Sequence, residues 1–188
     1  LPILDDGLRY RELHRLLNVF QATFVHESYD LMSIADGIIL TINNRNSDEL
    51  IDIFRTIGEK QFQFILQEKH FVRGGIAIGS HLSRSDNNNF LIGNGLSRAV
   101  KLESSCINHP VIGLDDINIK KLRALAGVEE GAGEFFGLQK TLNESGKDLY
   151  FIDFIKQDVR FEEILHEKIT ENSTNPSVQK KYIWLYRY

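Results

Sequence analysis

The stretch Phe-Val-Arg-Gly-Gly-Ile-Ala-Ile-Gly at residues 71–79 decides the fold of this 188-residue chain. Its apolar side chains predict a buried strand over residues 72–78. The glycines at positions 74 and 75 lie inside that strand, where a missing side chain marks a close approach of another backbone. We therefore expect another element of the fold to pack directly on this strand.

A second strand and a helix are expected soon after, over residues 90–92 and 96–106, beyond a polar loop at residues 83–89. Pro110 then opens a strand over 111–114, and a helix is expected over 117–126. Glycine and acidic residues over 127–137 predict a surface loop, followed by a strand over 150–155 and a helix over 161–169. The aromatic end, residues 180–188, is expected to pack on the domain or on a partner.

Two helices are expected before the central stretch. Residues 9–24 have apolar side chains at spacings of three and four, which is typical of a helix with one buried face. Ser47 is the expected N-cap of a longer helix that continues to about residue 66.

A hairpin is expected between these two helices. Asp36 and Gly37 stand between two apolar runs within residues 29–43, and Asp-Gly in that setting favours a tight turn. Taken alone the pair is a simple turn, but it also places a carboxylate at the tip of the hairpin.

Strands and helices alternate, and at least two hairpins are antiparallel. This order favours an α+β fold with a mixed sheet of ferredoxin-like type and helices packed on one face. The length suits a single domain over residues 1–188.

Composition narrows the classes of function. A net charge of −4 gives no general attraction for nucleic-acid phosphates, so we expect no DNA or RNA partner. No window approaches the apolar length of a membrane helix, so no membrane partner is expected. The single cysteine, Cys106, cannot form an internal disulfide and no secretory signal is visible, which together predict a cytoplasmic protein.

The motifs, in their order along the chain, resemble the class III nucleotidyl cyclase domain. That family has a hairpin carboxylate, a helix, a strand of the form Arg-x-Gly-Ile-x-x-Gly and a helix that opens on Gly-x-x-Val-Asn-x-Ala-x-Arg-Leu. The matching residues are Asp36 for the hairpin, Arg73, Gly75, Ile76 and Gly79 for the strand, and Gly93, Leu96, Ser97, Ala99, Lys101 and Leu102 for the helix.

The sequence is more similar to the bacterial pyrimidine cyclases of the Pycsar antiphage system. Their helix reads Gly-x-Gly-Leu-x-x-Ala-x-x-Leu-Glu and is followed by a proline. The residues that fit this version are Gly93, Gly95, Leu96, Ala99, Leu102, Glu103 and Pro110. The resemblance covers roughly residues 30–114 well and the C-terminal third in outline.

The resemblance implies that a ribose 3′ oxygen attacks the α-phosphate while pyrophosphate leaves, with two Mg²⁺ or Mn²⁺ ions per site. Asp36 matches the metal-binding aspartate at the hairpin. The family's first metal aspartate lies on an upstream strand, which we expect to be absent from residues 1–188. Asp5 and Asp6 are rejected as substitutes, because acidic residues beside a helix start simply favour the helix dipole.

Ser97 and Lys101 lie four positions apart and share one face of the expected helix. The resemblance implies that Ser97 orients the ribose and that Lys101 stabilises charge on the reacting phosphate, both as catalytic residues. The alternative for Lys101 is an ordinary solvated lysine. Arg98 is a neighbouring cation that could take over the role, and Arg73 is expected to be structural or to face phosphate.

Met32 and Phe90 occupy the positions at which purine cyclases read adenine with lysine and aspartate. Neither residue can form the strong hydrogen bonds that select adenine. Larger apolar side chains predict a smaller substrate-binding pocket that suits a pyrimidine, with UTP preferred over CTP. The alternative is that both residues belong to the core, since methionine commonly fills gaps there.

Two classes of function stay open. The first is a pyrimidine cyclase, a homodimer with active sites at the interface, whose cyclic UMP or CMP signals phage infection to a separate effector; an adenylate or guanylate cyclase is the alternative enzyme. The second is a non-catalytic cyclase-like module that binds a nucleotide or a partner. Zinc and phosphate-loop chemistry find no support, because the chain has no His-Glu-x-x-His, Cys-x-x-Cys or Gly-Lys-Ser/Thr motif.

Overall fold

The computed structural model describes residues 2–34, 37–43, 46–80, 82–84, 90–128, 134, 136–143 and 145–188. The side chains of residues 2–9, 34, 82–84 and 90–92 lie outside the description. Contacts divide the chain into two compact units, Leu1–Arg45 and Asn46–Tyr188, and each is described by itself. The expectation of one domain over residues 1–188 stays a prediction.

The first unit consists of a helix and a hairpin. The hairpin was expected, but Gly37, predicted to lie in its turn, is a strand residue that pairs with Ile34. Helix α1 spans Pro2–Phe24, and strands β1 (Asp30–Ile34) and β2 (Gly37–Thr41) pair antiparallel. The helix begins earlier than the apolar periodicity predicted, because proline is well suited to a first helical turn. The side chain of Gln21 on α1 donates a hydrogen bond to Ser33 on β1.

The second unit is built on a mixed sheet of four strands in the order β3-β6-β8-β7. The strands are β3 (Gly74–Gly75), β6 (Ile112–Asp115), β8 (Asp148–Ile152) and β7 (Leu138–Leu142). Strand β3 is parallel to β6, whereas β8 is antiparallel to both β6 and β7. A separate antiparallel pair joins β4 (Leu82–Arg84) to β5 (Phe90–Ile92). The expectation of an α+β fold with a mixed sheet is confirmed.

Helices contact both faces of this sheet. In α2 (Ser47–Glu68), a Cβ on Gly58 would lie 3.0 Å from the side chain of Ile152. In α3 (Asn94–Ser105), the carbonyl of Ala99 lies against Gly75. Gly75 is in register with Gly113 and Phe151, and therefore lies on the face opposite to Ile152.

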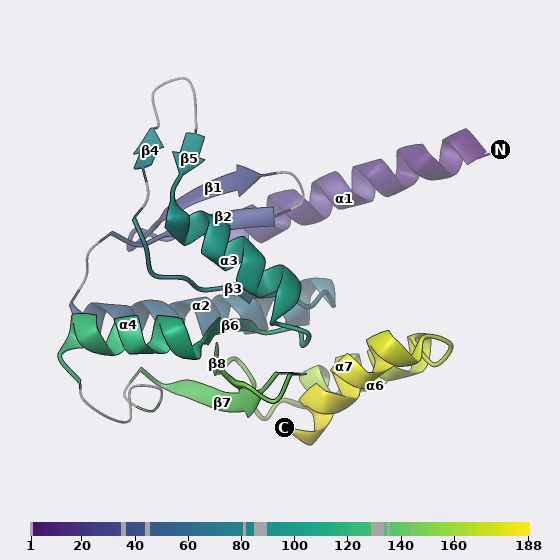
Figure 1. Cartoon of the computed structure of the whole chain (residues 1–188). Coiled ribbons are helices and arrows are strands. Elements are labelled where there is room, and N and C mark those ends of the chain that lie inside the picture. Colours follow the sequence, from purple (N-terminus) through teal and green to yellow (C-terminus); the bar gives the residue numbers. More distant parts are fainter. Residues whose placement is uncertain are drawn as a thin grey trace. The chain divides into compact units, whose positions relative to one another are not determined.

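Figure 1 shows the same arrangement, with α3 and α4 (Asp116–Ala126) in front of the sheet and α2, drawn fainter, behind it. The expectation of helices on one face was therefore wrong. The parallel connection from β3 through α3 to β6 brings a helix to the second face, which a fold made only of hairpins would leave open.

Helix α2 begins one residue earlier than its predicted cap suggested. Asn46 is the N-cap, and its side chain accepts a hydrogen bond from the amide of Glu49, whereas Ser47 is the first helical residue. The buried side of α2 includes Phe54 and Ile65, and the buried side-chain amide of Gln61 donates to the carbonyl of Val72 at 3.2 Å. The last contact ties α2 to the segment that leads into β3.

Two C-terminal helices complete the unit, α6 (Val159–Glu171) and α7 (Pro176–Arg187). The ring of Trp184 on α7 stacks on His109 at 4.1 Å between centroids and meets Phe151 of β8 edge-on at 5.6 Å. The aromatic end of the chain therefore packs on its own domain, one of the two outcomes expected for it.

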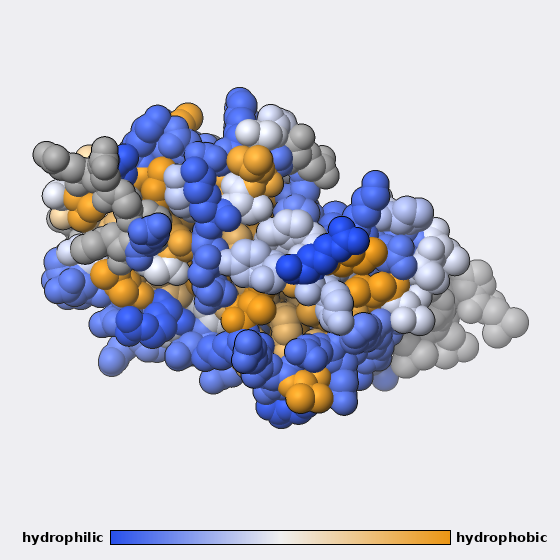
Figure 2. All heavy atoms as spheres, turned by 90° about the horizontal axis from the view of Figure 1, so that it is seen from below, coloured by the Kyte–Doolittle hydropathy of each residue, from blue (hydrophilic) through white to orange (hydrophobic). Residues whose placement is uncertain are grey.

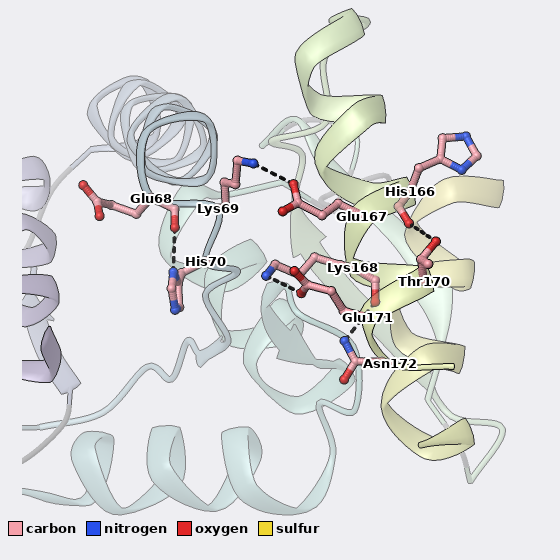
Figure 3. A network of polar contacts seen from close by, with 9 residues as sticks. All are labelled: Glu68, Lys69, His70, His166, Glu167, Lys168, Thr170, Glu171 and Asn172. Atoms are coloured by element: carbon pink, nitrogen blue, oxygen red, sulfur yellow. Dashed lines mark hydrogen bonds and ion pairs between the residues drawn. The ribbon is translucent and has the colours of Figure 1, made fainter. Parts of the chain in front are cut away.

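An ion pair links α6 to the end of α2. Lys69, the left-handed C-cap of α2, donates to a carboxylate oxygen of Glu167 at 2.6 Å, as Figure 3 shows. The hydrogen bond raises the pKa of Lys69 and lowers that of Glu167. Both side chains are well exposed, so the pair adds little to the free energy of unfolding.

The face seen from below in Figure 2 is mainly hydrophilic. In Figure 2 the hydrophobic residues of the face seen from below form small groups separated by hydrophilic residues. Within the described ranges, none of the helices has both the length and the apolar character required to cross a bilayer.

The adjacent glycines of β3 should differ sharply in their tolerance of alanine. A Cβ on Gly75 would overlap the carbonyl oxygen of Ala99 and lie 3.0 Å from the amide nitrogen of Glu103, all backbone atoms that cannot turn aside. A Cβ on Gly74 would meet only Ile112, at an ordinary 3.5 Å. Gly75→Ala should therefore lower the free energy of unfolding by about 1–3 kcal/mol in urea titrations, with Gly74→Ala as the matched control near wild type. Equal effects at the two positions would contradict this packing.

Candidate functional site

A cavity of about 550 Å³ opens to solvent along the first two turns of α3. Its described lining consists of Gly93, Asn94, Ser97, Arg98 and Lys101. The four side chains recur at spacings of three and four, so one face of the helix presents an amide, a hydroxyl and two cations. Ser97 and Lys101, the two residues predicted to be catalytic, are thus brought together in one cavity.

The segment after β3 fixes the first turn of α3. The amide of Gly95 donates to the carbonyl of Ser80 at 3.4 Å. Gly79 lies so close that a Cβ there would be 2.8 Å from the amide nitrogen of Gly95 and would overlap the side-chain oxygen of Asn94. Glycine at position 79 therefore allows the strand segment to run directly beneath the cavity.

The cavity favours anions. The hydroxyl of Ser97 donates to the carbonyl of Gly93 at 3.4 Å, which is a weak contact. Lys101 is exposed, and its amine has no hydrogen bond or ion pair with any residue that the structure describes. Because the cations Arg98 and Lys101 both line this space, a negatively charged group would be stabilised there.

Arg73 makes a different set of contacts from those of the cavity residues. Its guanidinium forms an ion pair with Glu103 on α3 and donates to the carbonyl of Ile107 at 3.4 Å. These contacts join the strand segment to the far end of α3. They agree with a structural role, whereas the phosphate-facing role stays a prediction.

A polar network that joins Ile78, Asn118 and Asp115 was not predicted from the sequence. The side-chain oxygen of Asn118 accepts the amide of Ile78 at 2.8 Å, and its side-chain nitrogen donates to Asp115 at 2.7 Å. Asp115 is also the N-cap of α4, accepting the backbone amide of Asn118 at 2.9 Å. Asn118 is only 3% exposed, and the amide of Ile78 is bound by this helix side chain where a sheet would offer the carbonyl of a neighbouring strand.

Two cations share the carbonyl of Ile78. Lys121 on α4 donates to it at 3.0 Å, and Arg98 on α3 donates at 3.5 Å. The only sequence signal for this arrangement was the Asp-x-x-Asn capping pattern at the start of α4. That pattern predicts a helix start, but it does not reveal which distant backbone group the asparagine will bind.

The remaining predicted site residues are not part of the described lining of this cavity. Asp36, the predicted metal ligand, lies outside the described residues. Met32 lies on β1 in the first unit, half-buried and opposite Ile39, whereas the cavity belongs to the second unit. The backbone of Phe90 pairs with Arg84 in the β4–β5 hairpin, and its side chain is outside the description.

The described residues contain no cluster of potential metal ligands. No three His, Cys, Asp or Glu residues there are arranged to hold an ion. Asp5 and Asp6 fall within α1, in agreement with their rejection as strand aspartates.

Comparisons with protein-family models, with curated proteins and with solved structures found no match. The resemblance to the cyclases therefore rests on the residues and their spacing, and membership of that family stays a prediction.

Loss of the Asn118 side chain should destabilise the second unit. Asn118→Ala leaves the amide of the half-buried Ile78 without its acceptor, so the free energy of unfolding should fall by about 1–3 kcal/mol. Asn18→Ala, which removes an exposed asparagine from α1, is the control and should not destabilise the protein. Urea unfolding followed by circular dichroism measures both variants; wild-type stability in Asn118→Ala would contradict the network.

Proposed function

We propose that this chain is a nucleotidyl cyclase that converts a pyrimidine nucleoside triphosphate, with UTP preferred over CTP, into a 3′,5′-cyclic nucleotide and pyrophosphate. The observation that carries the proposal is the cavity on α3, in which Ser97 and Lys101 meet at the positions where the cyclase motif has its ribose-orienting and phosphate-stabilising residues. The motif order around the cavity supports the same reaction.

In the proposed reaction the 3′ oxygen of the ribose attacks the α-phosphorus, the bond to the β-phosphate oxygen breaks and the hydroxyl proton passes to solvent. Lys101 offsets the charge that develops on the phosphate oxygens, and Ser97 holds the ribose by its hydroxyl. Asp36 is the proposed ligand of Mg²⁺ or Mn²⁺. When bound, two such ions would lower the pKa of the attacking hydroxyl and neutralise the leaving oxygens.

The choice of base rests on Met32 and Phe90, which are proposed to face the base. Their side chains offer no donor or acceptor to adenine, and their bulk suits the smaller pyrimidine ring. By the resemblance, the enzyme would act in the cytoplasm as a homodimer, and a separate effector would sense its cyclic product during antiphage defence.

A non-catalytic nucleotide-binding module is the second candidate. The observation that favours it is the described lining of the cavity, which has two cations and no carboxylate. Such a surface can bind phosphate without a metal ion. An adenylate or guanylate cyclase is the third candidate, and it differs from the other two in forming a cyclic purine nucleotide.

Product analysis tests the proposal directly. The full-length protein is incubated with each of the four ribonucleoside triphosphates and Mn²⁺, and the products are identified by mass spectrometry. Cyclic UMP or cyclic CMP is the expected product, whereas a cyclic purine nucleotide would contradict the role given to Met32 and Phe90. A folded protein that binds nucleotides but forms no product would be the binding module.

Lys101→Ala should reduce turnover about 100-fold, because a charge aimed at the reacting phosphate is lost. The matched control is Lys120→Ala, which removes a lysine of α4 that pairs with Asp116. Initial rates of pyrophosphate release should change by less than about twofold in this control. Equal rates in Lys101→Ala and wild type would exclude Lys101 from catalysis and leave Arg98 as the next cation to replace.

Asp36→Ala should abolish the product while leaving the circular dichroism spectrum unchanged, because the variant loses an oxygen ligand of a divalent ion. The neighbouring variant Asp30→Ala is the control, since it removes a carboxylate from the same hairpin. Retained turnover in Asp36→Ala would exclude this residue as the metal ligand.

A further inference from the structure

The carbonyl of Ile78 binds two cations at unequal distances. Lys121 donates at 3.0 Å and the guanidinium of Arg98 at 3.5 Å. A carbonyl oxygen has two lone pairs, so both contacts can coexist. The longer contact is the weaker one, and it belongs to the side chain that lines the cavity.

We infer that Arg98 binds a phosphate of a polyphosphate ligand in the cavity, and that Lys121 is the positioning residue that allows Arg98 to do so. The inference deepens the proposed function, since it concerns the same site. It names the triphosphate group, and not the base, as the part of the ligand that Arg98 contacts.

Arg98 is exposed on the cavity face of α3, one residue from Ser97 and three from Lys101. Its planar guanidinium matches two phosphate oxygens better than it matches the single carbonyl of Ile78. A charge-assisted bond to phosphate is also stronger than a bond to a neutral carbonyl. Arg98 therefore gains by turning from Ile78 to an anion in the cavity.

Leaving Ile78 would be costly if its carbonyl then lost every partner. Ile78 is half-buried, and an unpaired carbonyl in such a place opposes the movement of Arg98. Lys121 removes this cost because it keeps its own bond to the carbonyl at 3.0 Å. Asn118 holds the amide of the same residue, so the Ile78 peptide stays fixed while Arg98 moves.

Two cations on one helix face favour a ligand that carries several negative charges. Lys101 and Arg98 lie on consecutive turns of the same face, and the described lining has no carboxylate that would repel an anion. A chain of phosphates can contact both cations at once, whereas a monophosphate satisfies one of them. Inorganic triphosphate is therefore the probe that isolates this contact from base and ribose recognition.

Titration calorimetry of the full-length protein with inorganic triphosphate, at constant ionic strength and without divalent ions, tests the inference. Arg98→Ala should weaken binding about tenfold, as expected for the loss of a hydrogen bond to a charged group. Lys121→Met should weaken binding about threefold, because the carbonyl of Ile78 then retains Arg98. Lys121→Arg keeps a donor for that carbonyl and should bind like wild type.

The double variant separates positioning from simple charge. In the Arg98→Ala background, Lys121→Met should cause no further loss, because no arginine remains to be released. Lys120→Met removes the same charge from the same helix and should change binding less than about twofold in either background. An equal loss from Lys121→Met in both backgrounds would overturn the positioning role.

Unchanged binding in Arg98→Ala, or no binding of triphosphate by the wild-type protein, would overturn the whole inference. The outcome is independent of turnover. Tight binding that depends on Arg98, together with no cyclic product from any nucleotide, would reject the cyclase and leave the polyphosphate site standing. Cyclic product together with unchanged binding in Arg98→Ala would support the cyclase and reject the role of Arg98 in the polyphosphate site.

Discussion

The close contact between β3 and α3 is the constraint on which the rest of the second unit depends. Gly75 lies against the carbonyl of Ala99, and Gly79 lies against Asn94 and Gly95, with no space for a side chain at either glycine. The helix can therefore lie directly on the strand segment, and its opposite side is left to form the cavity with Ser97 and Lys101. A larger residue at either glycine would move the helix and, with it, every group that lines the cavity.

At the end of this strand segment the backbone groups form hydrogen bonds with side chains, where a sheet would provide the backbone of a neighbouring strand. Ile76 still donates to the carbonyl of Gly113 at 2.7 Å, but Ile78 donates to Asn118 and accepts from Lys121. Helix α4 thus closes the hydrogen bonding of the segment at the point where it turns towards α3. A buried asparagine whose side chain is bonded at both its oxygen and its nitrogen is held in place, which suits a backbone that must hold a binding cavity in one shape.

The residues to which the proposal gives a role are distributed over both units, and the two sets have different chemical tasks. The hairpin unit carries Asp36 and Met32, the residues proposed for the metal and the base, whereas the second unit carries the cations proposed for the phosphates. Phosphate can be bound by cations and helix amides alone, but cyclisation also needs a carboxylate that holds metal ions. In this proposal the second unit binds the phosphates, whereas catalysis also needs the carboxylate of the hairpin unit.

The sequence by itself determined the elements whose signals are local. The apolar periodicity predicted α2, and Pro110 marked the approach to β6. The β1–β2 hairpin was also predicted, but Gly37 pairs with Ile34 inside the hairpin and so does not belong to the turn that the Asp-Gly pair predicted. Strand β7 was missed, because only two of its residues, in Leu-Gln-Lys-Thr-Leu, are apolar, and its extended form depends on pairing with β8. The helices on both faces, the short β3 and the Asn118 network were decided only by the tertiary structure. Each of these depends on a partner distant in the sequence, and no local pattern specifies which buried polar group will meet which backbone.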